Sequence, residues 1–292
     1  MSKQKTLVLA KNFGAYFYLW ANSAHVNILL PELALYAQPG FLEQFDKIIL
    51  INGIEPQWLF HARWMREPRL DTYFFIWDPA RCPLYAPPPD TIELIKIWHK
   101  VYSFQQEDCE CFGLQFNSTM YALPPPGLIP EGHDVVCDIL FLGVPKDRLQ
   151  LLRDLYKQLM VLGLSVYFRI GLTNAKEDIV PEQAPGWLIT NEWLDYEIYL
   201  CMVLQSRCLL DLYQSIQTGF SLRVMEHIYF GKKLLTNNRA MKRADFYHSN
   251  NIFVLGENDM ASLKEWLELP FMPVSDEIKE YYKIENWAGR FQ

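Results

Sequence analysis

The chain has 292 residues, of which 50% are hydrophobic, 15% aromatic and 21% charged, and its formal net charge is -7. This length is enough for two domains of ordinary size, each with its own core. The acidic balance argues against a nucleic-acid-binding protein, which would carry a basic patch or stripe.

The cysteines and the first residues of the chain bear on where the protein works. Only Cys109 and Cys111 lie close together, and their C-E-C spacing is not a common zinc or redox motif. The first apolar stretch, residues 6–10, is interrupted by Lys11 and Asn12, unlike that of a secretory signal peptide. No apolar run reaches the ~20 residues that span a bilayer. We therefore expect reduced cysteines and a cytoplasmic protein, compatible with peripheral contact at the inner membrane face.

Short apolar runs alternate with longer helical patterns in the first half, which is typical of an α/β domain. The runs are rich in Val, Ile, Leu, Phe and Tyr with little alternation, as in a parallel sheet covered on both faces. The expected strands are residues 6–10, 47–52, 72–77, 100–104 and 110–115. The expected helices are residues 24–37, 57–66 and 91–98.

A proline-rich segment separates this half from a second one of the same kind. Residues 123–132 contain four prolines and two glycines, which prevent a regular element there. Beyond it, strands are expected at residues 135–142, 165–170, 207–212, 233–236 and 251–255. Helices are expected at residues 146–162, 193–205, 221–230, 259–267 and 276–287, and a polar loop at 173–186. The sequence thus predicts two Rossmann-like domains, residues 1–130 and 131–292, which face a cleft lined by the carboxyl ends of their strands.

The segment TGFSLRVMEHIYFGKKLLTNN, residues 218–238, has the features of an anion site. Gly219 permits a tight turn, and Ser221 is a favourable N-cap for a helix whose free N–H groups and dipole attract an anion. Arg223 lies in the first turn, where its charge opposes the dipole unless a bound diphosphate offsets it. Glu226, three residues later, can accept hydrogen bonds from ribose hydroxyls. An ordinary amphipathic helix with an Arg223–Glu226 salt bridge explains the same residues.

The strand, the G-x-S-x-R-x-x-E helix and the following GKKLLTNN resemble the nucleotide-sugar domain of bacterial GT-B glycosyltransferases. Within these, they are most similar to enzymes of lipopolysaccharide and capsule biosynthesis, related to spore-maturation-type glycosyltransferases. DILFLG at 138–143, SRCLLD at 206–211 and DFY at 245–247 resemble further parts of the same domain. YFFIWD at 73–78 resembles a strand end of the other domain. The resemblance covers most of residues 135–287 and only patches of residues 1–130.

This resemblance implies a hexosyltransferase-like enzyme that moves a sugar from a nucleotide-diphosphate donor to a surface glycan or glycolipid acceptor. Residues 1–130 would form the acceptor side. Arg223 would bind the diphosphate and Glu226 the donor ribose. The donor-binding residues that the resemblance implies are Gly143, Gly219, Ser221, Arg223, Glu226 and Asn237. Retaining GT-B enzymes carry a second acidic residue seven positions before the ribose-binding Glu, and its absence at Thr218-Gly219 leaves inverting and retaining chemistry both open.

An inverting transfer needs a general base, and Asp78, at the end of an expected strand and before Pro79, is the candidate. A turn cap before a proline explains Asp78 equally well, and His25 and His61 are alternatives. The chain has no Asp-x-Asp triplet, so we expect no metal and no cofactor other than the donor substrate. The alternative function is a noncatalytic subunit of a polysaccharide assembly complex that binds a nucleotide-sugar or glycan.

Overall fold

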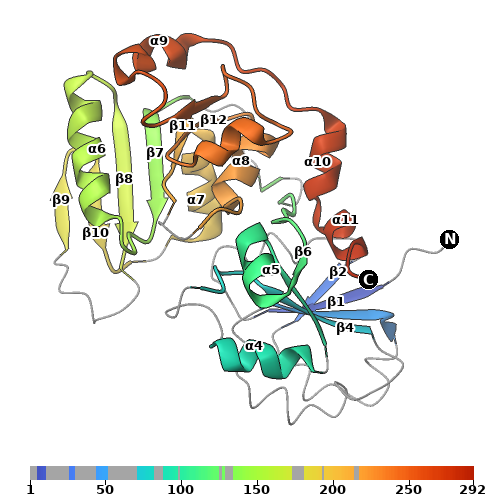
Figure 1. Ribbon diagram of the computed structural model, residues 1–292. Helices are drawn as coiled ribbons and strands as arrows, with labels where there is room; N and C mark the ends of the chain where they lie inside the picture. Colours follow the sequence, from blue (N-terminus) through green and yellow to red (C-terminus); the bar gives the residue numbers. More distant parts are fainter. Residues whose placement is uncertain are drawn as a thin grey trace. The chain divides into compact units, whose positions relative to one another are not determined.

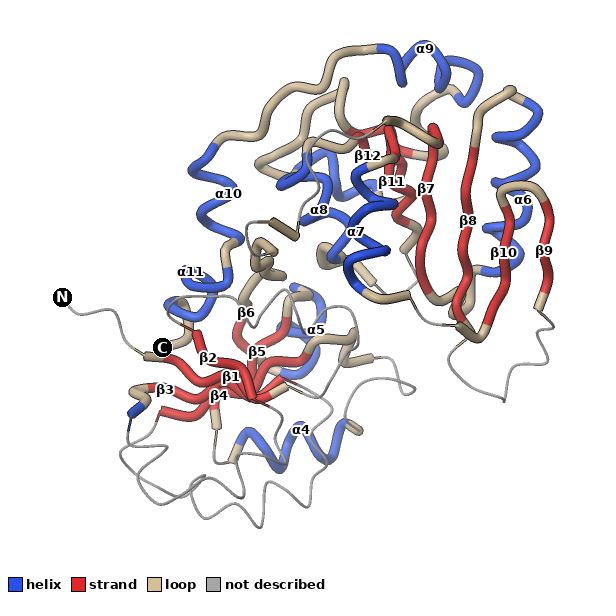
Figure 2. Tube along the Cα trace, turned by 180° about the vertical axis from the view of Figure 1, so that it is seen from behind, coloured by secondary structure: helices blue, strands red, loops and turns tan. Residues whose placement is uncertain are grey.

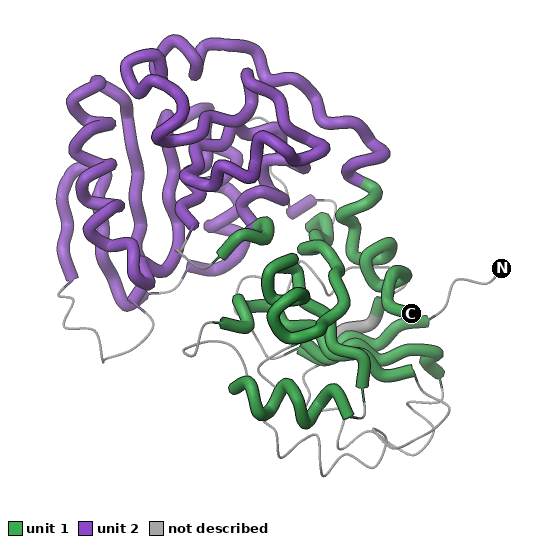
Figure 3. Tube along the Cα trace, viewed as in Figure 1, with its two compact units in different colours: residues 1–124, 216–220, 280–292 green, residues 125–215, 221–279 purple. Residues whose placement is uncertain are grey.

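The computed structural model forms two compact units, which Figure 3 shows in different colours. Unit 1 comprises Met1–Pro124, Ile216–Phe220 and Glu280–Gln292, and unit 2 comprises Pro125–Ser215 and Ser221–Lys279. The division thus departs from the expected halves, because two later segments belong to unit 1. The structure describes residues 5–10, 26–29, 44–51, 71–81, 88–97, 99–124, 127–128, 134–172, 181–192, 194–213 and 217–292.

Unit 1 is built on a sheet that has six strands in the described part of the chain. The strands are β1 (Thr6–Leu9), β2 (Val26–Leu29), β3 (Lys47–Ile51), β4 (Asp71–Ile76), β5 (Lys100–Ser103) and β6 (Gln115–Phe116). Their order is β2-β1-β3-β4-β5-β6, and neighbouring strands run parallel. Leu7, Val8 and Leu9 are all fully buried, so both faces of the sheet are covered, as predicted from the lack of alternation.

Different segments cover the two faces of this sheet. On one face, Leu9 and Ile76 share a core with Ile92 of α4 (Pro89–Lys96) and Cys109 of α5 (Gln106–Phe112). On the other face, the alternate residues of the strands contact α11 (Ile284–Gly289) and the residues after it. The Trp287 ring lies 5.1 Å from that of Phe75, and the Phe291 ring lies 4.5 Å from that of Tyr102. These aromatic contacts are the physical reason that Glu280–Gln292 belongs to unit 1.

Two secondary-structure predictions for the first half are wrong. Residues 110–115 were expected as a strand, but α5 runs to Phe112 and ends at Gly113, whose φ of 62° is left-handed. The helix presents a fully buried carboxylate, Asp108, toward the interior, so its inner face does not read as an apolar stripe. Residues 26–29 were expected within a helix, but they form β2 and pair in parallel with β1. The expected helix at 57–66 lies outside the described residues.

Unit 2 is built on a second sheet, of seven strands in the described ranges. The strands are β7 (Cys137–Gly143), β8 (Val166–Gly171), β9 (Glu182–Ala184), β10 (Trp187–Thr190), β11 (Ser206–Asp211), β12 (Lys233–Thr236) and β13 (Ile252–Val254). Their order is β13-β12-β11-β7-β8-β10-β9, and only β9 is antiparallel to its neighbour; Figure 2 shows the strands from β12 to β9 side by side. From β7 the chain builds outward through β8 and β10, and then returns to build β11, β12 and β13 on the other side. The strand order therefore reverses between β7 and β11, which is a topological switch point.

Helices cover both faces of the second sheet (Figure 1). Leu152 and Leu159 of α6 (Leu149–Val161) share a core with Phe141 and with Leu263 of α9 (Leu263–Glu268). The helices α7 (Tyr196–Leu204) and α8 (Leu222–Phe230) pack against β7, β11 and β12. The remaining elements of the described residues are η3 (Arg239–Arg243), η4 (Met260–Ser262) and α10 (Asp276–Tyr282). No helix in the described ranges has the length and apolar character needed to cross a bilayer.

The polar loop expected at 173–186 is partly wrong, because β9 and β10 form a hairpin there. The hairpin turns at Pro185-Gly186, and Gly186 has a φ of 73°. A Cβ atom at Gly186 would overlap the backbone oxygen of Val166 on β8, so the turn requires glycine. The three exposed residues of β9 have no apolar pattern, which is why the sequence did not predict a strand there.

Candidate functional site

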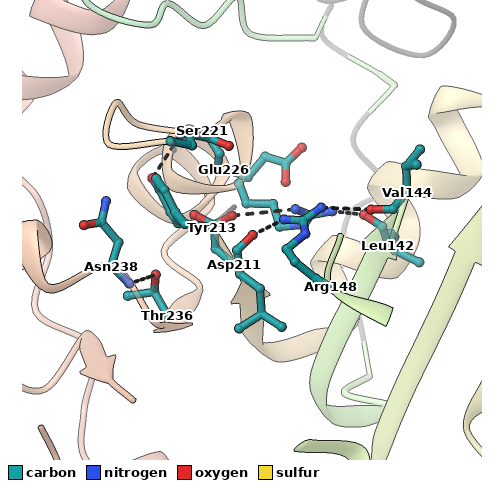
Figure 4. A network of polar contacts seen from close by, with 12 residues as sticks. Leu142, Val144, Arg148, Asp211, Tyr213, Ser221, Glu226, Thr236 and Asn238 are labelled. Atoms are coloured by element: carbon teal, nitrogen blue, oxygen red, sulfur yellow. Dashed lines mark hydrogen bonds and ion pairs between the residues drawn. The ribbon is translucent and has the colours of Figure 1, made fainter. Parts of the chain in front are cut away.

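Two arginine side chains lie in unit 2 near the carboxyl ends of β7 and β11, where the strand order reverses. Figure 4 shows one of them, Arg148, with its acceptor Val144 and the nearby Asp211. Arg148 immediately precedes α6, and its guanidinium donates to the backbone oxygens of Val144, at 2.9 Å, and Leu212. Arg223 lies in the first turn of α8 and donates to the backbone oxygen of Leu142. The starts of two helices thus direct guanidinium groups to the ends of two adjacent strands.

Asp211, the last residue of β11, is the anionic partner in this cluster. It is buried, and its Oδ1 lies 3.6 Å from Nη1 of Arg223. Burial raises the pKa of Asp211, while the charge of Arg223 opposes that rise. The Arg223 guanidinium also lies over the Phe141 ring, 4.7 Å from its centroid. Two guanidinium groups thus lie at the strand ends near the buried Asp211 carboxyl group, where they can contact an anionic ligand.

Gly143 ends β7 beside these arginines. Its φ is 155°, and a Cβ atom built on it would overlap Nη2 of Arg223. The resemblance implied that Gly143 is a donor-binding residue. In the structure, its missing side chain leaves room for the Arg223 guanidinium at the end of β7.

Ser221 is the N-cap residue of α8, as predicted. Its φ of -82° and ψ of 170° are extended, but its side chain makes no capping hydrogen bond. Its N–H donates to the hydroxyl oxygen of Tyr213 at 3.2 Å, and its buried hydroxyl lies beside the Asp211 carboxyl group, where it acts to lower the pKa of Asp211. The side chain therefore caps none of the first-turn N–H groups of α8, of which that of Val224 donates to the Ser221 carbonyl oxygen at 3.2 Å.

Glu226 is fully buried in the middle of α8. Its Oε2 accepts a hydrogen bond from the Tyr199 hydroxyl at 2.8 Å, and its Oε1 has no hydrogen-bond partner among the described residues. Burial raises the pKa of Glu226 to about 7, although the Tyr199 hydrogen bond and the charge of Arg223 both act to lower it. Arg223 pairs with Asp211 and Glu226 bonds to Tyr199, so an ordinary salt bridge within α8 does not account for these contacts.

Two other predicted donor residues make local structural contacts. The Asn237 side chain accepts from the Tyr213 N–H at 2.7 Å and donates to the Tyr213 carbonyl at 3.3 Å, so it ties the chain after β12 to the chain after β11. Gly219 belongs to unit 1, whereas Ser221 and Arg223 belong to unit 2. A Cβ atom on Gly219 would lie 2.5 Å from Cδ2 of Phe104, so this glycine is required for packing within unit 1.

Asp78 lies two residues after β4, at the carboxyl edge of the first sheet, and is half-buried. The chain just after it is held by Asp108, whose carboxylate accepts from the Ala80 N–H at 2.6 Å and from the Arg81 guanidinium at 2.8 Å. The turn that carries Asp78 is therefore fixed to α5. The alternative bases, His25 and His61, lie outside the described residues.

Three residues of the site were missed from the sequence: Arg148, Asp211 and Tyr199. Arg148 could have been found by the argument applied to Arg223, since it follows the Gly-Val-Pro turn and starts a helix. Asp211 ends a predicted strand at the edge where ligands bind in α/β sheets. Tyr199 carries no such signal, because a tyrosine on a helix face reads as a core residue. Among the described residues, no group of three or more His, Cys, Asp and Glu side chains could hold a metal ion.

Neither a protein-family profile nor a curated protein matches the chain. An alpha-glucosyltransferase in complex with UDP-glucose and DNA containing an abasic site is similar in structure, with a TM-score of 0.55 and 11% identity over 98% of this chain and 92% of that chain. A glycosyltransferase involved in avilamycin A biosynthesis has a TM-score of 0.49 at 13% identity, over 86% of this chain and 84% of that one. Sucrose-phosphate synthase from Thermosynechococcus elongatus has a TM-score of 0.47 at 9% identity, over 98% and 91%. The first likeness shows the fold, which is that of GT-B proteins with two Rossmann-like domains, as the sequence predicted.

Proposed function

We propose that the chain is a glycosyltransferase that moves a sugar from a nucleotide-diphosphate donor to a glycan or glycolipid acceptor. The observation that carries the proposal is the pair of arginines, Arg148 and Arg223, at the switch point of the second sheet. Nucleotides bind at such switch points in open α/β sheets. Guanidinium groups match the geometry of phosphate oxygens, and their charge stabilises the nucleoside diphosphate as it leaves.

Phosphate oxygens of the bound donor would replace backbone oxygens that now accept hydrogen bonds from the two arginines. In the structure, both guanidinium groups donate to uncharged carbonyl oxygens at the strand ends. A phosphate oxygen is a stronger, charged acceptor, so a bound diphosphate would displace those contacts. The uncapped start of α8 at Ser221 would add N–H donors, and Glu226 Oε1 would accept from the donor ribose. Arginine and helix dipole together would supply the charge that other glycosyltransferases take from a metal.

The transfer also needs a general base for the acceptor hydroxyl group. Asp78 would be the general base, because it follows β4 on a turn that Asp108 holds in place. The resemblance of residues 135–287 supports lipopolysaccharide or capsule as the acceptor, with transfer taking place in the cytoplasm. The alpha-glucosyltransferase of the same fold was captured with UDP-glucose, which makes UDP-sugars the first donors to test.

Calorimetric titration with UDP and with GDP tests the donor site. We expect the wild-type protein to bind one of them, and Arg148→Ala and Arg223→Ala each to weaken binding by about tenfold or more, the usual effect of losing a charge-assisted hydrogen bond. Arg153→Ala is the matched control, since Arg153 lies one turn further along α6 and pairs with Glu182 at 2.8 Å. Equal binding by all four proteins would contradict the assignment of the site.

A noncatalytic subunit that binds a nucleotide-sugar or glycan is the alternative function, and one position of the chain also departs from the pattern of retaining enzymes. Thr218-Gly219 stands where those enzymes have a second acidic residue, and this stretch belongs to unit 1, where Gly219 packs on Phe104. A subunit that only binds nucleotide-sugars would show the calorimetric results above without turning over any donor. If the protein binds UDP or GDP but cleaves none of the nucleotide-sugars, that result would favour the noncatalytic alternative.

A further inference from the structure

A tyrosine hydroxyl is directed at the buried carboxyl group of the candidate donor site. Tyr199 lies on α7, and its hydroxyl donates to Glu226 Oε2 at 2.8 Å, within unit 2. Its ring is stacked on that of Tyr196, one turn earlier, with centroids 5.9 Å apart and planes at 22°. Both tyrosines are buried, so the stacked pair holds the hydroxyl of Tyr199 in a defined place.

The hydrogen bond from Tyr199 satisfies only one of the two carboxyl oxygens of Glu226, unlike the hydrogen bonds of a fully paired polar group in a protein core. Glu226 is fully buried, and its second oxygen, Oε1, has no partner among the described residues. A buried acceptor without a hydrogen bond destabilises the fold, so an apolar residue would be more favourable if α8 were only structural. An unsatisfied oxygen beside Arg223 and the start of α8 is what a ligand with a hydroxyl donor would complete.

The groups that face Glu226 decide its charge. Burial raises its pKa to about 7, and Asp211 at the end of β11 acts in the same direction. Tyr199 on α7 and Arg223 on α8 act to lower the pKa, because each interacts favourably with the ionised form. The neighbouring His227 ring is engaged elsewhere, through Nδ1 with the backbone oxygen of Lys232. Tyr199 is thus the one uncharged group in this set that favours the carboxylate.

We propose that Tyr199 is a positioning residue of the donor site, which holds the Glu226 carboxylate through Oε2 and leaves Oε1 as the acceptor for a ribose hydroxyl of the nucleotide. The inference rests on the proposed function, in which Glu226 contacts the donor ribose. An ionised carboxyl group only accepts hydrogen bonds, whereas a protonated one also donates. Nucleotide affinity should therefore rise as Glu226 loses its proton, and it should depend on Tyr199.

The test compares Tyr199→Phe with Tyr196→Phe, which each remove one hydroxyl from the same stacked pair. The affinity of each protein for UDP, for GDP and for their 2′,3′-dideoxy analogues is measured by calorimetry from pH 6 to pH 9. We expect Tyr199→Phe to weaken binding of the ribonucleotide about tenfold at pH 7, to recover toward wild type at pH 9, and to lose most of the preference over the dideoxy analogue. Tyr196→Phe should keep the wild-type pH profile and the wild-type preference.

The outcomes separate this inference from the function on which it rests. If the two variants share one pH profile of nucleotide affinity, Tyr199 does not act through Glu226. The same holds if Tyr199→Phe weakens binding of the ribonucleotide and of its dideoxy analogue by the same factor. If the wild-type protein binds neither nucleotide at any pH, the proposed function fails instead. A ligand-free measurement still tests the contact in that case: titration of the Glu226 carboxyl carbon by NMR should give a higher pKa in Tyr199→Phe than in the wild type. An unchanged pKa would overturn the inference.

Discussion

Replacing Glu226 with glutamine removes a buried titratable group and keeps the shape of the side chain. Burial raises the pKa of Glu226 from an ordinary 4.5 to about 7. Between these values the native state holds a proton that the unfolded state releases, so the free energy of unfolding falls as the pH rises. At about 1.4 kcal/mol per pKa unit, the wild type should lose on the order of 2–3 kcal/mol between pH 5 and pH 8 that Glu226→Gln does not lose.

The comparison with the variant is needed because a neighbour acts in the opposite direction. Burial lowers the pKa of His227 from 6.5 to about 4, so its contribution to stability is lost as the pH falls through this range. Both proteins contain His227, and its effect cancels in the difference between them. Urea titrations at pH 5, 6, 7 and 8 measure that difference, with Glu197→Gln as the control at an exposed position of α7. Parallel pH dependences of wild type and Glu226→Gln would refute the reasoning, because they would mean that Glu226 titrates as it does in the unfolded chain.

Three further substitutions each test a contact within one of the two units. Gly143→Ala should weaken UDP or GDP binding in calorimetry, since its Cβ atom would displace the Arg223 guanidinium; unchanged affinity would mean that this arginine is not part of the site. Trp287→Ala should lower the free energy of unfolding by about 3–5 kcal/mol in urea titrations, because it empties the aromatic core that covers the first sheet, and a loss below about 1 kcal/mol would contradict that packing. Gly219→Ala should cost about 1–3 kcal/mol in the same titration, because its Cβ atom would lie 2.5 Å from Cδ2 of Phe104, and a neutral result would show that the segment packs elsewhere.

The fold was predictable where buried strands and helices have clear boundaries. The strand expected at 233–236 is β12, and the helix expected at 221–230 is α8 with its N-cap at Ser221. Prediction failed where tertiary contacts override the local pattern. The inward carboxylate of Asp108 accepts hydrogen bonds from Ala80, Arg81 and Gln105, and nothing in residues 106–112 reveals the first two of these donors. The placement of Glu280–Gln292 likewise depends on aromatic partners more than 180 residues away along the chain.

The candidate site shows the same limit. Arg223 and Ser221 were predicted because a helix start can be recognised from a short stretch of sequence. The partner of Glu226 was not, because Tyr199 lies 27 residues earlier and only the packing of α7 beside α8 brings its hydroxyl within 2.8 Å. Asn237 was expected among the donor-binding residues, but its amide pairs with both backbone groups of Tyr213, a pairing that a single sequence does not disclose.

Release of a nucleoside diphosphate from sugar donors tests the proposed function most directly. The protein is incubated with UDP-glucose, with other UDP-sugars and with GDP-sugars, and free UDP or GDP is measured over time. We expect the wild type and Arg153→Ala to release the nucleotide from at least one donor, and Arg148→Ala and Arg223→Ala to be strongly impaired. Failure of the wild type to bind or turn over any of these donors, or full activity in both arginine variants, would contradict the proposed function.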